Sequence, residues 1–204
     1  DMAYILDTGN DDIRSEGMSY GMMICVQLDK KEEFDRLWKF AKTYSQHKPG
    51  TAREGLFSWQ VNRTDFSMMD QNSASDGEEY FVTALFFADA RWGSRVDGDF
   101  DPEKDVFDYR AQANYILDNM LNKADSDSGQ CPSNMVNLNE KQIVFTPCGT
   151  AATFTDPSYH LPGFYEIWAL YADNNNDLWS DMATTSRTYL LPRAAHPVTG
   201  LIPD

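Results

Sequence analysis

The sequence predicts an all-α domain in which two layers of helices pack against each other. Apolar residues recur at three- and four-residue steps in six stretches, which is the period of an α-helix. Some of these stretches are apolar on nearly every side and others on one side only, which indicates an inner ring of helices covered by an outer ring. No run of strict two-residue alternation is long enough to predict a large sheet. The six stretches cover roughly residues 17–29, 33–45, 78–92, 106–121, 161–173 and 177–191.

The distribution of apolar residues in each predicted helix indicates whether the helix lies in the inner or the outer layer. The first stretch, "MSYGMMICVQL", and the third, "YFVTALFFADARW", are apolar nearly all round, so we expect them to be buried on most sides. The second, "EEFDRLWKFAKTY", has one apolar face opposite its charges, as a surface helix does. We therefore predict consecutive antiparallel pairs, with the first, third and fifth helices inside and the second, fourth and sixth outside. The apolar face of the second helix consists of Phe34, Leu37, Trp38, Ala41 and Tyr44.

The composition fits one globular domain, which we expect to span residues 1–204. With 42% hydrophobic residues and 13% aromatics, the chain can bury a sizeable core. A net charge of -15 and a pI near 4.4 argue against nucleic acid or an anionic membrane as a partner and favour a neutral ligand. The sequence shows no membrane span and no signal peptide, which favours a cytoplasmic location, although the chain begins at Asp1 rather than Met.

Cysteines and histidines give no sign of a metal or cofactor. Cys25 lies in an apolar run and is expected in the core, whereas Cys131 and Cys148 bracket one loop and could pair in an oxidising compartment. No zinc spacing is present, so we predict no metal and no cofactor. The histidines are too scattered to suggest a ligand set: His47, His160 and His196.

Two long loops, roughly 46–76 and 123–159, carry most of the candidate functional residues. Polar clusters stand directly before three predicted inner helices: "DDIRSEGMSYG", "NSASDGEEY" and "FTDPSYHLP". In a layered helical fold the starts of inner helices converge at one end, so these segments could meet in one cleft. Simpler interpretations remain open, because Ser75 or Asp76 before Glu78 and Glu79 resembles an ordinary N-cap, and Tyr159 could belong to the core.

Glu16 is the acid that capping explains least well. It is flanked by Gly17, Ser19 and Gly21, which permit close approach, and by Tyr20 and a group of methionines that is itself more typical of core packing. In such surroundings we expect the carboxyl to be buried, which disfavours its charged form and keeps a proton available for a leaving group.

Trp59, in "LFSWQV", is a candidate for stacking against a sugar ring, and the alternative that it pins the loop to the core is equally compatible with the sequence. Carboxylates, aromatics, a low pI and the lack of a phosphate-binding glycine loop favour a carbohydrate over a nucleotide as the ligand.

Three long motifs resemble glycoside hydrolase family 8, and most closely its reducing-end xylose-releasing exo-oligoxylanases. They are "DTGNDDIRSEGMSYGMMICVQLDKKEEFDRLW", "ASDGEEYFVTALFFADARWG" and "TDPSYHLPGFYEIWALYA", and the resemblance runs from near Tyr4 to "HPVTGLIPD". It implies an (α/α)6 barrel and hydrolysis of β-1,4-xylosidic bonds in xylo-oligosaccharides, with inversion and release of xylose from the reducing end.

The resemblance also implies roles for individual residues. Glu16 would be the general acid, and Asp76 would bind and help distort the sugar at the cleavage point. Tyr159 would help to hold the attacking water, and Trp59 would stack against a sugar.

One departure from the family pattern concerns the general base. The family's Asp base lies downstream of the "HPVTGL" region, so we expect it beyond Asp204, which does not match it in local context. The resemblance thus implies an interior piece with about half the ring. Two alternatives stay open: an endo-acting family member that cuts xylan, β-glucan or chitosan, and a non-catalytic sugar-binding fragment.

Overall fold

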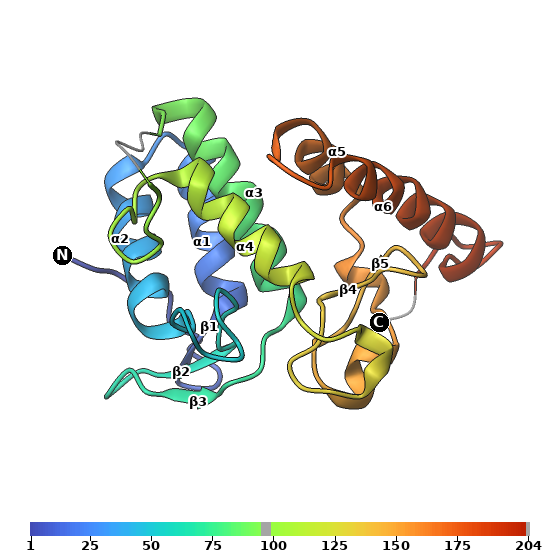
Figure 1. The fold of residues 1–204 in the computed structure, drawn as a ribbon, viewed down its shortest axis with the longest axis horizontal. Helices are drawn as coiled ribbons and strands as arrows, with labels where there is room; N and C mark the ends of the chain where they lie inside the picture. Colours follow the sequence, from blue (N-terminus) through green and yellow to red (C-terminus); the bar gives the residue numbers. More distant parts are fainter. Residues whose placement is uncertain (95–98, 203–204) are drawn as a thin grey trace. The chain divides into compact units, whose positions relative to one another are not determined.

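Helices dominate the computed structural model, which describes residues 1–94 and 99–202 (Figure 1). Each of the six predicted stretches overlaps one α-helix, so this part of the prediction is confirmed. The helices are α1 (Ser15–Gln27), α2 (Lys31–Phe40), α3 (Ser75–Trp92), α4 (Tyr109–Leu121), α5 (Pro162–Tyr171) and α6 (Asn176–Tyr189).

Two of these helices run on into a π-helical turn. After α2, residues Ala41–Ser45 form such a turn, in which the Gln46 amide donates to the Ala41 carbonyl at 2.9 Å. After α6, residues Leu190–Ala194 do the same, with the Ala195 amide donating to Leu190 at 2.9 Å. The predicted helical stretches 33–45 and 177–191 therefore continue past the ends of α2 and α6.

The chain divides into two compact units, residues 1–120 and 121–204. In the first unit α1 packs against both α2 and α3. In the second, α5 packs against α6, with the Trp168 and Trp179 rings perpendicular at 5.2 Å between centroids. A short hairpin of β4 (Val136–Asn137) and β5 (Gln142–Ile143) and a Cys131–Cys148 disulfide also belong to the second unit.

A small antiparallel sheet leads into α1. Its strands are β1 (Asp12–Arg14), β2 (Gln60–Asn62) and β3 (Met68–Asp70), in the order β1-β2-β3. Ile13 lies opposite Val61, and both side chains are buried. Because β1 ends at Arg14 and α1 begins at Ser15, this sheet fixes the position of the first turn of α1.

Burial differs between the helices predicted to be internal. In α3 most side chains are buried, as predicted, and Phe81 stacks on Phe57 of the long loop at 4.5 Å between ring centroids. One face of α1 is exposed, since the exposed fraction of Ile24 is 58%. The expectation of burial on most sides therefore holds for α3 and is wrong for α1. Of α5, the fifth predicted helix, only Tyr165 and Trp168 are buried.

Candidate active site

Three of the predicted site segments meet at Ser15, the first residue of α1. The Ser15 amide donates to the Trp59 carbonyl at 3.0 Å. On the other side Ser15 faces Gly77 of α3 so closely that a Cβ on Gly77 would lie 2.7 Å from the Ser15 hydroxyl. Glu16 directly follows Ser15, and Asp76 directly precedes Gly77. The fold thus brings the starts of α1 and α3 together with the Trp59 loop.

A tyrosine pair lies one helical turn beyond the two acids. Tyr20 follows Glu16 by four residues on α1, and Tyr80 follows Asp76 by four residues on α3, so each tyrosine shares a helix face with its acid. The two rings are 4.3 Å apart between centroids. Burial raises the pKa of Tyr20, and the negative charges of Asp76 and Glu16 raise it further. Both carboxylates therefore act on the same tyrosine hydroxyl.

Glu16 is exposed, so the prediction that it is buried against the core is wrong. The reason is the face of α1 that packs inward: Met18 and Ser19 are buried, while Tyr20 and Ile24, four and eight residues after Glu16, are exposed. Glu16, Tyr20 and Ile24 therefore form an exposed stripe along α1, and Glu16 is its first residue. Its carboxyl is directed by the helix to the same face as Tyr20 and not into the methionine cluster.

Asp76 is buried, and it lies inside the first turn of α3, past the N-cap position. The N-cap position of α3 is Ala74, which makes no side-chain capping bond, so the interpretation of Ser75 or Asp76 as an ordinary N-cap is wrong. Glu78 and Glu79 in the same turns have no exposed surface. Burial raises the pKa of Glu78 to about 8, although the hydrogen bond from the Phe57 amide favours its charged form.

Trp59 is half-buried beside the start of α1, with one face of its ring occupied. The Arg14 guanidinium lies 5.3 Å from the ring centroid, within the range of a cation–π interaction. The Trp59 amide donates to the Asn72 carbonyl at 2.9 Å. A ring held in this way has only its second face for a sugar, and its role in stacking stays a prediction.

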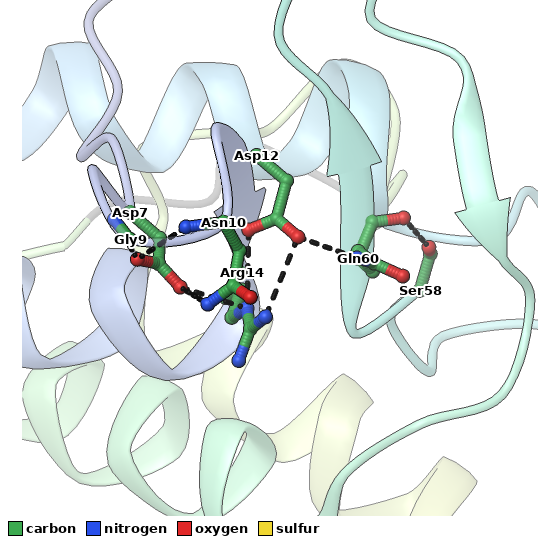
Figure 2. Close-up of polar contacts among 7 residues, drawn as sticks. All are labelled: Asp7, Gly9, Asn10, Asp12, Arg14, Ser58 and Gln60. Carbon is green, nitrogen blue, oxygen red and sulfur yellow. Dashed lines mark hydrogen bonds and ion pairs between the residues drawn. The ribbon is translucent and has the colours of Figure 1, made fainter.

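A polar network that the sequence analysis did not identify fixes Arg14 (Figure 2). The Arg14 Nε lies 3.1 Å from Asp12 Oδ1 and 3.1 Å from Asp7 Oδ2, and the Gln60 side-chain amide donates to Asp12 Oδ2. The Asp12 hydrogen bond and charge raise the pKa of Arg14, so the guanidinium stays charged. Asp12 and Arg14 are two residues apart on one strand, so their side chains lie on the same face of the sheet. This i, i+2 spacing is the feature of the sequence from which their pairing could have been predicted.

Tyr159, the fourth predicted site residue, belongs to the second unit. Its ring stacks on Phe145 at 5.6 Å between centroids, and Phe145 in turn stacks on Phe154 at 5.3 Å. Its carbonyl accepts a hydrogen bond from the Tyr165 hydroxyl at 3.1 Å. Contact with Glu16 or Asp76 stays a prediction, and Asp204 lies outside the described residues.

Neither a metal site nor a membrane span is found in the part of the chain that the structure describes. Residues 1–94 and 99–202 contain no group of three or more His, Cys, Asp and Glu side chains placed to hold a metal ion. Within the same residues, no helix combines the length and the apolar character that crossing a membrane requires.

Comparison with known proteins identifies close relatives over the whole chain. The family model Glycosyl hydrolases family 8 matches residues 4–204. The reducing-end xylose-releasing exo-oligoxylanase Rex8A of Paenibacillus barcinonensis is 47% identical over 208 residues, which cover 100% of this chain and 50% of that protein. More distantly, Endoglucanase 2 of Ruminiclostridium josui is 27% identical over 199 residues, which cover 96% of this chain and 36% of that protein.

The fold agrees with a solved structure of the same relative. The structure of Rex8A from Paenibacillus barcinonensis complexed with xylose superposes with a TM-score of 0.85 at 46% identity, and the match covers 100% of this chain and 50% of that one. These matches confirm the all-α, (α/α)6-barrel class predicted from the sequence. The chain spans about half the length of the curated relatives it matches.

Proposed function

Because this chain belongs to glycosyl hydrolase family 8, we propose that its protein hydrolyses β-1,4-xylosidic bonds in xylo-oligosaccharides and releases xylose from the reducing end with inversion. The observation that carries this proposal is the meeting of Glu16, Trp59 and Asp76 around Ser15. Support for the substrate class comes from the names of the relatives at 40–47% identity, which are reducing-end xylose-releasing exo-oligoxylanases.

The two acids have different roles at the cleaved bond. Glu16 donates the proton to the leaving oxygen as general acid, and Asp76, held in a buried position at the start of α3, binds the sugar ring on the non-reducing side and helps to distort it. Inversion requires a water on the opposite face of the ring and a carboxylate base to activate it, and we propose that Tyr159 helps to hold this water.

Glu16 is exposed, so water reaches its carboxyl in the protein without substrate. A sugar bound between Glu16, Asp76 and the Tyr20 ring would displace this water. We therefore assign the desolvation of Glu16 to the bound substrate.

The test of this function is Glu16→Gln, which preserves the shape of the side chain and removes the proton donor. On xylotriose kcat should fall by roughly 10²- to 10⁴-fold, the usual contribution of general acid catalysis, with little change in binding. Xylosyl fluoride, whose leaving group needs much less protonation, should be hydrolysed with a smaller loss. Equal losses on both substrates would contradict the general-acid role.

Glu33→Gln serves as the matched control. Glu33 is an exposed carboxylate in the first turn of α2, away from the segments that meet at Ser15, so its loss should leave kcat unchanged. A wild-type protein that binds xylotriose without hydrolysing it would instead favour a non-catalytic sugar-binding role.

An endo-acting hydrolase is the second candidate, because relatives at 27% identity are named endoglucanases. Products from xylohexaose separate the two modes. Release of xylose and the shortened oligosaccharide from the earliest times supports the exo reaction, whereas internal fragments support endo cleavage.

The cytoplasmic location predicted from the sequence stays a prediction. The Cys131–Cys148 disulfide weighs against it, because disulfides persist mainly in oxidising compartments.

A further inference from the structure

Glu78 is a buried carboxyl for which the proposed reaction has no direct use. Its side chain has no exposed surface, and it stands in the fourth position of α3, too far along the helix to act as its N-cap. Its Oε1 atom accepts a hydrogen bond from the Phe57 amide at 2.9 Å. This bond joins α3 to a loop 21 residues earlier in the chain.

The loop that Glu78 holds is the one that carries Trp59. The Phe57 carbonyl accepts from the Ser73 hydroxyl at 2.8 Å, so both polar groups of the Phe57 residue are fixed by side chains at or before the first turns of α3. Phe57 also stacks on Phe81, one turn further along the same helix. Two residues later, the Trp59 carbonyl accepts from the amide of Ser15 at 3.0 Å.

A continuous path therefore runs from Glu78 through Phe57 and Trp59 to Ser15. Each step is a hydrogen bond or a covalent connection, and the path ends at the residue beside Glu16. Asp76 starts from the same helical turn as Glu78, two residues earlier. A shift of the Phe57 peptide would move the Trp59 ring and the first turn of α1 relative to Asp76.

We propose that Glu78 is a positioning residue, whose buried carboxyl fixes the Phe57 peptide and thereby sets Trp59 and the start of α1 relative to Asp76. The proposal deepens the proposed function and rests on it for its kinetic consequences. Its structural consequence, the anchoring of residues 57–59, is independent of the substrate.

The test compares Glu78→Gln with Glu78→Leu in the whole protein. Gln keeps an oxygen that can accept from the Phe57 amide, so KM for xylotriose should stay within about two-fold of the original value. Leu has a similar size and no acceptor, and loss of a buried hydrogen bond should raise KM on the order of ten-fold. A result in which Gln and Leu behave alike would overturn the role of the carboxyl oxygen as acceptor.

Val82→Ala separates positioning from loss of stability. Val82 is fully buried one turn after Glu78 on α3, and its truncation destabilises the same helix without touching the Phe57 bond. At a temperature where all variants are folded, Val82→Ala should leave KM unchanged. An equal rise in KM for Val82→Ala and Glu78→Leu would mean that Glu78 acts only through stability.

Amide hydrogen exchange keeps the test independent of the reaction. In Glu78→Leu the amides of Phe57 and Trp59 should exchange at least ten-fold faster than in Val82→Ala. Unchanged exchange at these amides would overturn the anchoring itself. Faster exchange in a protein whose original form neither binds nor cleaves xylotriose would retain the anchoring and reject the proposed function.

Discussion

His160, next to the predicted water-holding Tyr159, is a buried residue whose charge at acidic pH is set by its surroundings. Its ring is buried, with Nε2 2.8 Å from the Thr155 hydroxyl and Nδ1 2.9 Å from the Ser186 hydroxyl. Burial lowers the pKa of His160 to about 4, although the negative charge of Asp156 acts in the opposite direction. The imidazole is therefore neutral in the folded protein at neutral pH and ties α6 to the Tyr159 segment.

This neutral imidazole predicts a loss of stability in acid. An unfolded histidine takes up a proton near pH 6.5, whereas the folded one does so near pH 4. Between these values the unfolded state binds more protons, so the contribution of His160 is complete above pH 6.5 and is lost as the pH falls toward 4. In His160→Gln the free energy of unfolding, measured with urea at several pH values, should decline less over this window.

His196→Gln is the matched control, because it makes the same replacement at an exposed histidine. If the His160 and His196 variants show the same slope, another group causes the acid sensitivity.

At the scale of the elements, the close approach of α1 and α3 at Ser15 and Gly77 determines where the two candidate acids lie. In Gly77→Ala the added Cβ would meet the Ser15 hydroxyl at 2.7 Å and the Ser15 Cβ at 2.9 Å. The helices must then separate, and we expect a loss of about 1–3 kcal/mol in the free energy of unfolding, as for other overpacked sites. Xylotriose hydrolysis should fall as well.

A second substitution tests whether this contact is the cause. Ser15→Gly removes the clashing side chain, so adding it to Gly77→Ala should recover part of the lost stability in a double-mutant cycle. Gly163→Ala in α5 is the control, because nothing lies within 4 Å of its added Cβ, and it should be neutral or slightly stabilising. Strict additivity of the Ser15 and Gly77 effects would contradict the proposed contact.

The helices could be predicted from the sequence because their periodicity is local. The three-residue strands could not, since Ile13 pairs with Val61 across 48 positions and neither segment shows a long alternation. The same limit applies to the site. Motifs identified Glu16 and Asp76, but which face of α1 packs inward, and hence the exposure of Glu16, depends on contacts with distant segments. The Arg14 guanidinium over Trp59 depends on such contacts too.

For the molecule as a whole, the two units differ in what stabilises them. The first, residues 1–120, has a core of large aromatic side chains that includes Trp38, Phe57 and Phe81. The second, residues 121–204, has the Trp168 and Trp179 rings packed between α5 and α6, and a disulfide that joins Cys131 to Cys148 across the β4–β5 hairpin, with a sequence separation of 17. Covalent closure thus supports the segment that leads to Tyr159.

Removal of this disulfide should therefore act on the second unit. Replacing Cys131 and Cys148 with Ala should lower its stability by about 3 kcal/mol, the chain-entropy value for a loop of this length. Hydrogen exchange should quicken in residues 121–160 and stay unchanged in α3. Cys25→Ala, which removes the free cysteine, is the control, and equal effects on both units would contradict a local role of the disulfide.

The π-helical turns that end α2 and α6 have a consequence for how sequences in this family can change in length. The hydrogen-bonded ring of such a turn contains one residue more than that of an α-helix, as the bonds from Gln46 to Ala41 and from Ala195 to Leu190 show. Loss of one residue there converts the turn to an α-helical one and leaves the preceding helix in place. Deletion of one residue should therefore be tolerated at 41–45 and 190–194, and selected against within α3, where a shift by one residue would turn buried side chains toward solvent.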